Sequence, residues 1–184
     1  MNIFILDKNP VAAAQLQCDK HVVKMILESA QMLSTAHRLL DGRMVLGKSK
    51  SGRTAKTWVL DDIVRDTLLY KAVHVNHPCT IWTMESRANY DWHFQHFEAL
   101  HDEYIHRYGK THKSYTSLAN VLVDAPDNIP YAPMTPFKLA MGAAPECINE
   151  QDPVGSYRAF YQTKQDRFKM TWTKRDIPEW FEEL

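Results

Sequence analysis

One stretch of the sequence gathers side chains that could transfer protons, stabilise charge or act as nucleophiles. His21, Lys24, Glu28 and Gln31 follow one another at steps of three and four residues. Residues at these steps lie on one face of a helix, so an imidazole, an amine, a carboxylate and an amide would project from the same side. This set is either the centre of a reactive site or an exposed polar stripe, which is the commonest fate of glutamate and lysine.

The element that must position these residues is a long helix. Apolar residues recur at helical spacing from Ala13 to Leu40, on a face other than the polar one. Asn9 is a suitable N-cap, Pro10 fits the first helical turn, and Gly42 is a typical residue just beyond a helix end. The pattern predicts a helix from about Pro10 to Leu40, with or without a break.

A basic segment follows this helix directly. Between Arg43 and Lys56 the chain has five cations, two glycines and no acidic residue. We predict a basic loop or a short β-hairpin, which could contact several phosphates or could simply be solvated. The cations are Arg43, Lys48, Lys50, Arg53 and Lys56.

The remaining segments predict further helices and an ordered loop. Trp58 to Val73 has no clear type, although Asp61 or Asp62 could cap a short helix there. A new helix should follow Asn76, His77 and Pro78. The most certain one after the first runs from Arg87 to Tyr108, because aromatic residues recur at steps of three and four up to Gly109. We expect this aromatic stripe to face the core.

Most of the nine prolines lie between Asp124 and Pro153, where we expect an ordered loop with at most one helical turn. Pro153 should then open a third major helix, whose face includes Tyr157, Phe160, Lys164 and Phe168. Aromatic residues near the C-terminal end should fix the tail to the core. These are Trp172, Trp180 and Phe181.

Composition narrows the class of protein. The 184 residues are 45% hydrophobic, which is enough for one well-packed core, and we expect a single, mostly α-helical domain over residues 1–184. Lys plus Arg and Asp plus Glu both number 22, so any nucleic-acid binding must come from a local basic patch. The odd number of widely spaced cysteines and the lack of a long apolar segment favour a cytoplasmic protein.

The nine histidines raise the question of a metal site. His93 and His96 would lie together on the second certain helix, and His101 and His106 lie further along it. No acidic residue or cysteine completes a recognisable ligand set, so we expect no metal and no cofactor.

Two motifs resemble a known family. Asp19, Lys20, His21 and Val22, followed by Glu28, resemble the stretch around the catalytic glutamate of phage endonuclease V-type pyrimidine-dimer DNA glycosylases. The second motif resembles a pattern of related bacterial proteins and agrees with it in order and rough separation. It consists of Asn76, His77, Pro78, Trp82, Glu103, Tyr104, Arg107, Tyr108 and Gly109. The resemblance covers residues 1 to about 114.

The resemblance implies a helical enzyme that kinks double-stranded DNA and flips a nucleotide. In this family an N-terminal α-amine attacks C1′ of the damaged sugar, and a glutamate stabilises the positive charge that develops there. Glu28 matches that glutamate, and Met1 would supply the amine. An α-amino group has an ordinary pKa of about 7.7 to 8.0, against about 10.4 for lysine, so it is the better nucleophile near neutral pH.

One position departs from the phage pattern. There the initiator methionine is removed to expose a threonine amine, whereas the bulky Asn2 should leave Met1 in place. Lys24 or Lys20 is the alternative amine, if burial and a neighbouring cation lower its pKa.

The expected catalytic residues are therefore Glu28, Met1 and Lys24. The expected DNA contacts are the basic segment, the start of the first helix and the second motif, with Trp58 or Trp82 placed to stack on an extruded base. By residue they are Lys20, His21, Lys24, Arg43, Lys48, Lys50, Arg53, Lys56, His77 and Trp82. His77 could equally be only a helix cap.

We expect a monomer that binds double-stranded DNA and no membrane. Its activity would be that of a DNA glycosylase or lyase on a damaged or modified pyrimidine. Two alternatives remain. One is a transferase that adds a small amine or amino acid to an activated pyrimidine in phage DNA, and the other is a non-catalytic DNA-binding or host-interaction protein.

Overall fold

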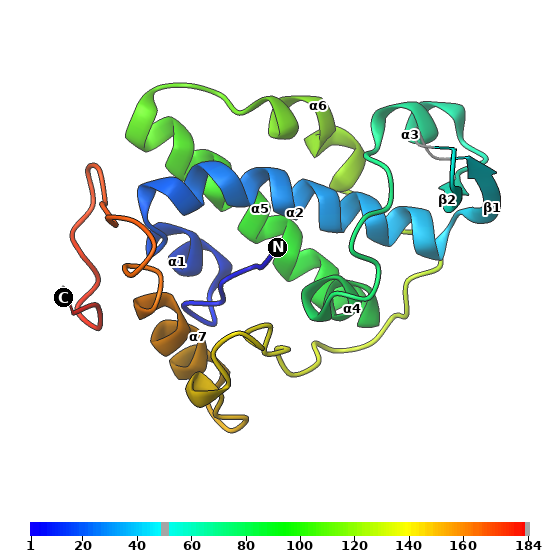
Figure 1. Ribbon diagram of the computed structural model, residues 1–184. Coiled ribbons are helices and arrows are strands. Elements are labelled where there is room, and N and C mark those ends of the chain that lie inside the picture. The colour runs from blue at the N-terminus through cyan, green and yellow to red at the C-terminus, as the bar shows by residue number, and fades with distance from the viewer. Residues whose placement is uncertain (49–51, 183–184) are drawn as a thin grey trace.

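A computed structural model describes residues 1–48 and 52–182, and it is mostly α-helical (Figure 1). The predicted Lys50 therefore lies outside the described residues. The elements, in chain order, are α1 (Pro10–Gln15), α2 (Asp19–Leu40), β1 (Arg43–Lys48), β2 (Thr54–Val59), α3 (Ile63–Leu68), α4 (Pro78–Glu85), α5 (Arg87–Tyr108), α6 (Lys113–Leu122), the 3-10 turn η1 (Pro145–Cys147) and α7 (Pro153–Gln162).

The centre of the molecule is the pair α2 and α5, which cross in the middle of Figure 1. Helices α4 and α6 also pack against α2, and α1 packs against α5. The buried face of α2 carries Val22, Met25, Ile26 and Leu33, as its apolar spacing predicts. The β-hairpin lies at the C-terminal end of α2, and α7 lies near its N-terminal end (Figure 1).

The expected first helix is broken between α1 and α2, because residues around the break bond to distant parts of the chain. The backbone N–H of Cys18 donates to the Tyr161 hydroxyl at 2.9 Å, and that of Asp19 donates to the Thr171 carbonyl at 2.8 Å. The Gln17 amide donates to the Ile3 carbonyl at 3.1 Å. The first two contacts replace backbone hydrogen bonds that a continuous helix would make, and the third ties the Gln17 side chain to the N-terminal segment.

Helix α5 has the bounds that its aromatic spacing predicts, and Gly109 ends it with a left-handed φ of 64°. The short helix capped by Asp62 and the helix after His77 are also confirmed, as α3 and α4. Helix α6 was not predicted, because its sequence contains several residues of weak helix propensity. Its N-cap is His112, whose Nδ1 accepts from the N–H of Ser114.

The basic segment forms the antiparallel hairpin β1–β2, one of the two predicted forms. Arg38 ties it to the bundle, because its guanidinium donates to the Trp58 carbonyl at 2.8 Å and to Asp66 Oδ1 at 2.7 Å. The same guanidinium reaches the carbonyls of Tyr70 and Leu69. One buried cation therefore fixes the hairpin and α3 relative to the end of α2.

The proline-rich segment is extended apart from η1, and it contacts the core through Met141 and Phe137. Helix α7 begins at Pro153 as predicted but ends at Gln162, so the expected helical course as far as Phe168 was wrong. Trp172 and Phe181 are buried and pack together with ring centroids 4.8 Å apart, which confirms the fixed tail. Within the described residues, no helix is long and apolar enough to cross a membrane.

Candidate active site

The N-terminal segment threads through the interior. Residues 2–6 are buried, since Ile3, Phe4, Ile5 and Leu6 form an apolar run that joins the core. The Asn2 side chain donates to the Ala140 carbonyl at 2.8 Å and accepts from the Phe4 N–H at 2.9 Å. This anchoring holds Met1 against the middle of α2, where the N label lies in Figure 1.

The α-amine of Met1 lies beside Glu28. Its nitrogen is 3.6 Å from Glu28 Oε2, and the backbone N–H of Asn2 donates to the same oxygen at 2.9 Å. Lys24 approaches the other oxygen, with Nζ 3.3 Å from Oε1. The Glu28 side chain is only 11% exposed, whereas the Lys24 side chain is 64% exposed. A nearly buried carboxylate thus contacts two amines, one fixed and one at the surface.

His77 borders this group from the start of α4. Its Nδ1 accepts from the Cys79 N–H at 3.2 Å, so it does cap the helix. Burial, the Met1 ammonium and His74 lower the pKa of His77, while Glu28 opposes that shift. Met1 is also held from α4, because the Thr80 hydroxyl lies 3.9 Å from its sulfur. The structure therefore brings together Met1, Lys24, Glu28 and His77, all four of which the sequence singled out.

His21 does not lie on an exposed stripe, and that expectation was wrong. Its ring is buried, stacks on Phe4 with centroids 4.6 Å apart, and its Nδ1 is 2.7 Å from the Tyr161 hydroxyl. Burial, with Lys24 and Lys164 nearby, lowers the pKa of His21 to about 3. The ring is therefore neutral and covered by α7. Lys20 is exposed, with its ammonium 4.5 Å from the centre of the Phe168 ring.

Asp19, the first residue of the first motif, fixes the chain. It is 3.0 Å from Arg107 Nη1 and accepts from the hydroxyls of Thr171 and Thr173. Arg107, whose side chain is fully buried, also pairs with Glu103, and Glu103 pairs with Arg175 of the tail. Both conspicuous residues of the second motif, Glu103 and Arg107, are thus part of an ion cluster that joins α5, α2 and the tail.

Comparison with known proteins identifies the family of the chain. A family model described as pyrimidine dimer DNA glycosylase matches residues 1–116. The chain belongs to this family. No curated protein and no solved structure matched it. The match includes Met1, Lys24, Glu28 and His77, while α7 and the tail lie outside it.

Trp82 of this glycosylase-family chain was expected at the surface, where it could stack on an extruded base, but the structure places it elsewhere. It is 1% exposed and packs against Trp92 and Phe137, with ring centroids 5.7 and 5.2 Å away. Since the ring is part of the core, the expected surface position was wrong. Trp58 is half-buried at the base of the hairpin.

A groove of about 530 Å³ runs along the hairpin of this glycosylase-family member. Lys48, Lys56 and Lys71 line it together with Trp58. Arg43 and Arg53 are exposed on the same hairpin. Three lysines around an aromatic side chain form a surface suited to a nucleic-acid strand.

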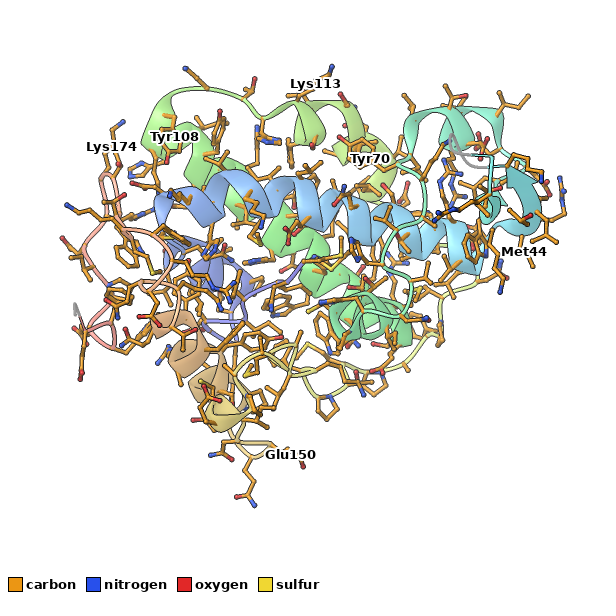
Figure 2. The ribbon with its side chains drawn as sticks, in the orientation of Figure 1. Met44, Tyr70, Tyr108, Lys113, Glu150 and Lys174 are labelled. Carbon is orange, nitrogen blue, oxygen red and sulfur yellow. The ribbon has the colours of Figure 1, made fainter. Side chains whose placement is uncertain are left out.

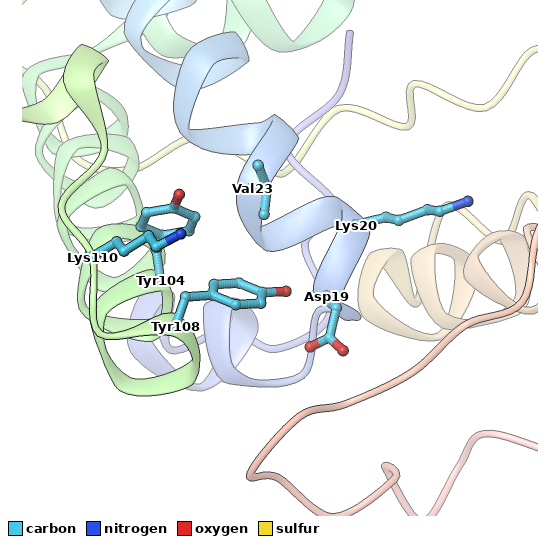
Figure 3. Close-up of a pocket in the computed structure, with 6 residues that line it drawn as sticks. All are labelled: Asp19, Lys20, Val23, Tyr104, Tyr108 and Lys110. Atoms are coloured by element: carbon cyan, nitrogen blue, oxygen red, sulfur yellow. The ribbon is translucent and has the colours of Figure 1, made fainter.

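A second cavity, of about 390 Å³, lies between the first turns of α2 and the C-terminal end of α5 (Figure 3). Tyr104, Tyr108 and Lys110 form one wall and Val23 the opposite one. The sequence had assigned the whole aromatic stripe of α5 to the core. Tyr90 and Phe97 are buried as expected, whereas Tyr104 and Tyr108 are half-buried. Tyr104 packs against the core, and both tyrosines also line this cavity.

Two of the histidines considered as ligands, His93 and His96, bond within the core. His93 Nδ1 is 2.8 Å from the Thr83 hydroxyl, and His96 Nδ1 is 2.9 Å from the Pro10 carbonyl. In the part of the chain that is described, no group of three or more His, Cys, Asp or Glu side chains could hold a metal ion.

Proposed function

We propose that this family member acts on a damaged or modified pyrimidine nucleotide in double-stranded DNA, with the α-amine of Met1 as nucleophile and Glu28 as the carboxylate that assists it. The observation that carries the proposal is the 3.6 Å distance between this amine and Glu28 Oε2 inside a nearly buried site. The α-amine is positioned by five buried residues that follow it, whereas Lys24 is largely exposed.

The chemistry requires a nucleotide that has left the base stack, because C1′ cannot reach a buried amine inside a duplex. The uncharged amine forms a bond to C1′ while the bond from C1′ to the base nitrogen breaks. The base leaves with that electron pair and takes up a proton. The attacking nitrogen then loses a proton and forms its second bond to C1′ while the C1′–O4′ bond breaks. O4′ keeps that electron pair and takes up a proton, which leaves an imine between Met1 and C1′.

Glu28 has two roles in this scheme. Its negative charge stabilises the positive charge that develops on the sugar as the base departs, as carboxylates do in glycoside cleavage. Once the imine has formed, the same carboxylate can take a proton from C2′. A double bond then forms between C2′ and C3′, the C3′–O bond breaks, and the 3′ phosphate leaves with the electron pair, which cleaves the strand. Lys24, on the other oxygen, orients the carboxylate from the solvent side.

DNA binding is assigned to local surfaces, because the net charge of the chain is zero. The groove beside the hairpin supplies Lys48, Lys56 and Lys71, and the exposed side of α2 supplies Lys20 and Lys24. Helix α2 connects the two, with Glu28 between them. About 15 Å of helix separates Glu28 from Arg38 at the hairpin end.

The test is borohydride trapping on duplexes that carry a thymine dimer, hydroxymethyluracil, uracil or an abasic site. We expect a covalent adduct with at least one of them, and intact-mass analysis should place it on the N-terminal residue. A short extension before Met1 should abolish trapping, and an extension of equal length after Leu184 should not. Lys24→Arg should leave trapping detectable, because arginine keeps the charge but cannot form an imine.

Two results would contradict the proposal. If Lys24→Arg abolishes trapping and the N-terminal extension does not, Lys24 is the nucleophile. If the wild type gives no adduct but adds mass to a modified pyrimidine in the presence of a small amine, the reaction is transfer to the base, with Glu28 as its general base.

A further inference from the structure

Lys164, just beyond the end of α7, is a buried cation without an acidic partner. The residue is 7% exposed, and among the described residues no carboxylate lies within 4.0 Å of its ammonium. Its Nζ is 3.2 Å from the centre of the Phe160 ring and 3.4 Å from the Thr163 hydroxyl. A buried charge is normally paired, because removing it from water is costly.

The lysine is close to the surface even though its side chain is covered. Thr163 and Gln165, its neighbours in sequence, are half-buried, and Asp166 and Arg167 are exposed. Burial of the ammonium and the nearby guanidinium of Arg167 lower the pKa of Lys164 to about 8. At neutral pH the group is still mainly charged, so an anion that reaches it would gain a strong partner.

Lys164 belongs to the surroundings of the candidate active site. Its charge acts on His21, as does that of Lys24. The His21 ring stacks on Phe4, and Phe4 stacks on Phe160, with centroids 6.1 Å apart. Phe4 is in turn part of the segment that holds Met1 beside Glu28.

Lys20 borders the same aromatic cluster. Its ammonium lies over Phe168, whose ring meets the edge of His21 at a centroid distance of 5.5 Å. Lys20 and Glu28 are eight residues apart on α2, which corresponds to about 12 Å of helix. Cations thus flank Glu28 on both sides along α2, with the hairpin lysines at one end and Lys20 and Lys164 at the other.

We propose that Lys164 binds a phosphodiester of the substrate DNA strand next to the reacting nucleotide, on the side of Glu28 opposite the hairpin. This inference rests on the proposed function. It gives the chain just after α7, which lies outside the segment matched by the family, a part in substrate binding. The phosphate contact expected of His21 is thereby made by Lys164, which lies near that buried neutral ring.

The test measures affinity for a duplex with a tetrahydrofuran abasic analogue, which the enzyme can bind but not cleave, over a range of salt concentrations. Lys164→Met keeps the apolar stem and removes the charge. We expect about tenfold weaker binding, as for the loss of a charge-assisted hydrogen bond. The slope of log Kd against log salt should fall by about one. Lys113→Met is the matched control, because Lys113 points outward from α6 (Figure 2).

The fold is checked in parallel. Because Lys164 has no acidic partner, Lys164→Met should leave the Tm unchanged or raise it, whereas a large fall would show a structural role and overturn the inference. A second measurement needs no variant. A neutral methylphosphonate in place of a phosphate next to the analogue should weaken binding of the wild type about tenfold, because it removes the negative charge that Lys164 would contact.

The outcomes separate the two proposals. If the wild type binds the analogue and forms the borohydride adduct while Lys164→Met binds equally well, only the assignment of Lys164 fails. Equal affinity of the wild type for the methylphosphonate duplex and the unmodified duplex has the same meaning. If the wild type does not bind duplex DNA at all, the proposed function fails and the role of Lys164 fails with it.

Discussion

At the residue scale, the environment of Glu28 determines what its carboxylate can do. Oε2 accepts the Asn2 N–H and faces the Met1 amine, while Oε1 faces Lys24. The hydrogen bond from Asn2 is part of the backbone and fixes the orientation of the group. The exposed Lys24 is a weaker, screened partner. Oε2 of Glu28 is therefore held in a fixed position on the buried side, whereas the contact of Oε1 with Lys24 on the solvent side can be broken easily.

Glu28→Gln should abolish most activity and cost little stability. We expect strand cleavage to fall at least about 100-fold, because the neutral amide cannot stabilise a positive sugar. The free energy of unfolding should fall by about 1 kcal/mol, since glutamine can still accept from Asn2 but leaves both amines without a charge partner. Single-turnover cleavage and urea denaturation measure the two effects.

Glu150→Gln is the control, because Glu150 is exposed on the loop before α7 (Figure 2) and should change neither quantity. Cleavage by Glu28→Gln within a few-fold of the wild type would remove Glu28 from the chemistry. A much larger loss of stability would mean that this carboxylate mainly holds the N-terminal segment in place.

The residues of the candidate site were easier to predict than their surroundings. The two motifs singled out Glu28 and His77, the helical spacing Lys24, and the family resemblance Met1, and the structure places the four together. The spacing along α2 could not show that α7 covers His21, because the covering residue Tyr161 is 140 positions away. One signal in the sequence indicated that Lys164 is buried, because it occupies a core-facing position in the helical spacing that begins at Pro153.

At the scale of elements, regular spacing predicted helices and tertiary contacts decided where they end. Helix α5 has its predicted bounds because its aromatic face and Gly109 are local signals. The break before α2 depends on Tyr161 and Thr171, which are far away in sequence. No local pattern contains that information.

The strand register of the hairpin predicts which of its cations bind DNA, which its total charge alone cannot do. In the register of β1 and β2, Leu46 pairs with Lys56 and Lys48 pairs with Thr54. Side chains alternate between the faces of a strand, so Lys48 and Lys56 share one face and Arg43 lies on the other. Trp58, opposite Met44, is on the lysine face.

We expect Lys48→Gln combined with Lys56→Gln to raise the Kd for duplex DNA about tenfold and to lower the salt slope by about two. Arg43→Gln, on the opposite face, should have a smaller effect than either lysine substitution alone. Fluorescence anisotropy with a labelled duplex at several salt concentrations measures both quantities. Equal effects of all three substitutions would show that the hairpin acts only through its net charge.

At the scale of the whole molecule, the interior contains several histidines that are neutral in the folded state. Burial lowers the pKa of His37 and of His96 to about 4, that of His21 to about 3, and that of His93 well below its ordinary value. Their ring nitrogens bond to Tyr90, to the Pro10 carbonyl, to Tyr161 and to Thr83. These rings connect α2, α5, α7 and the N-terminal segment, so their protonation would affect most of the fold.

The consequence is a loss of stability in mild acid. A histidine whose pKa is about 4 when folded and 6.5 when unfolded binds its proton first in the unfolded chain. The unfolded state therefore gains protons as the pH falls from about 6.5 towards 4, and the free energy of unfolding falls with it. Each such histidine contributes about 2 kcal/mol between pH 6.5 and 5. Several together rival the usual 5–15 kcal/mol stability of a domain.

We therefore expect cooperative unfolding at a pH near 5, well above the range in which paired carboxylates become protonated. Urea denaturation at a series of pH values between 7 and 5 should give a slope that corresponds to at least two protons taken up on unfolding. His37→Gln should reduce that slope by about one proton, because one neutral buried ring is removed. A flat profile over this range would show that these rings take up protons while the protein stays folded.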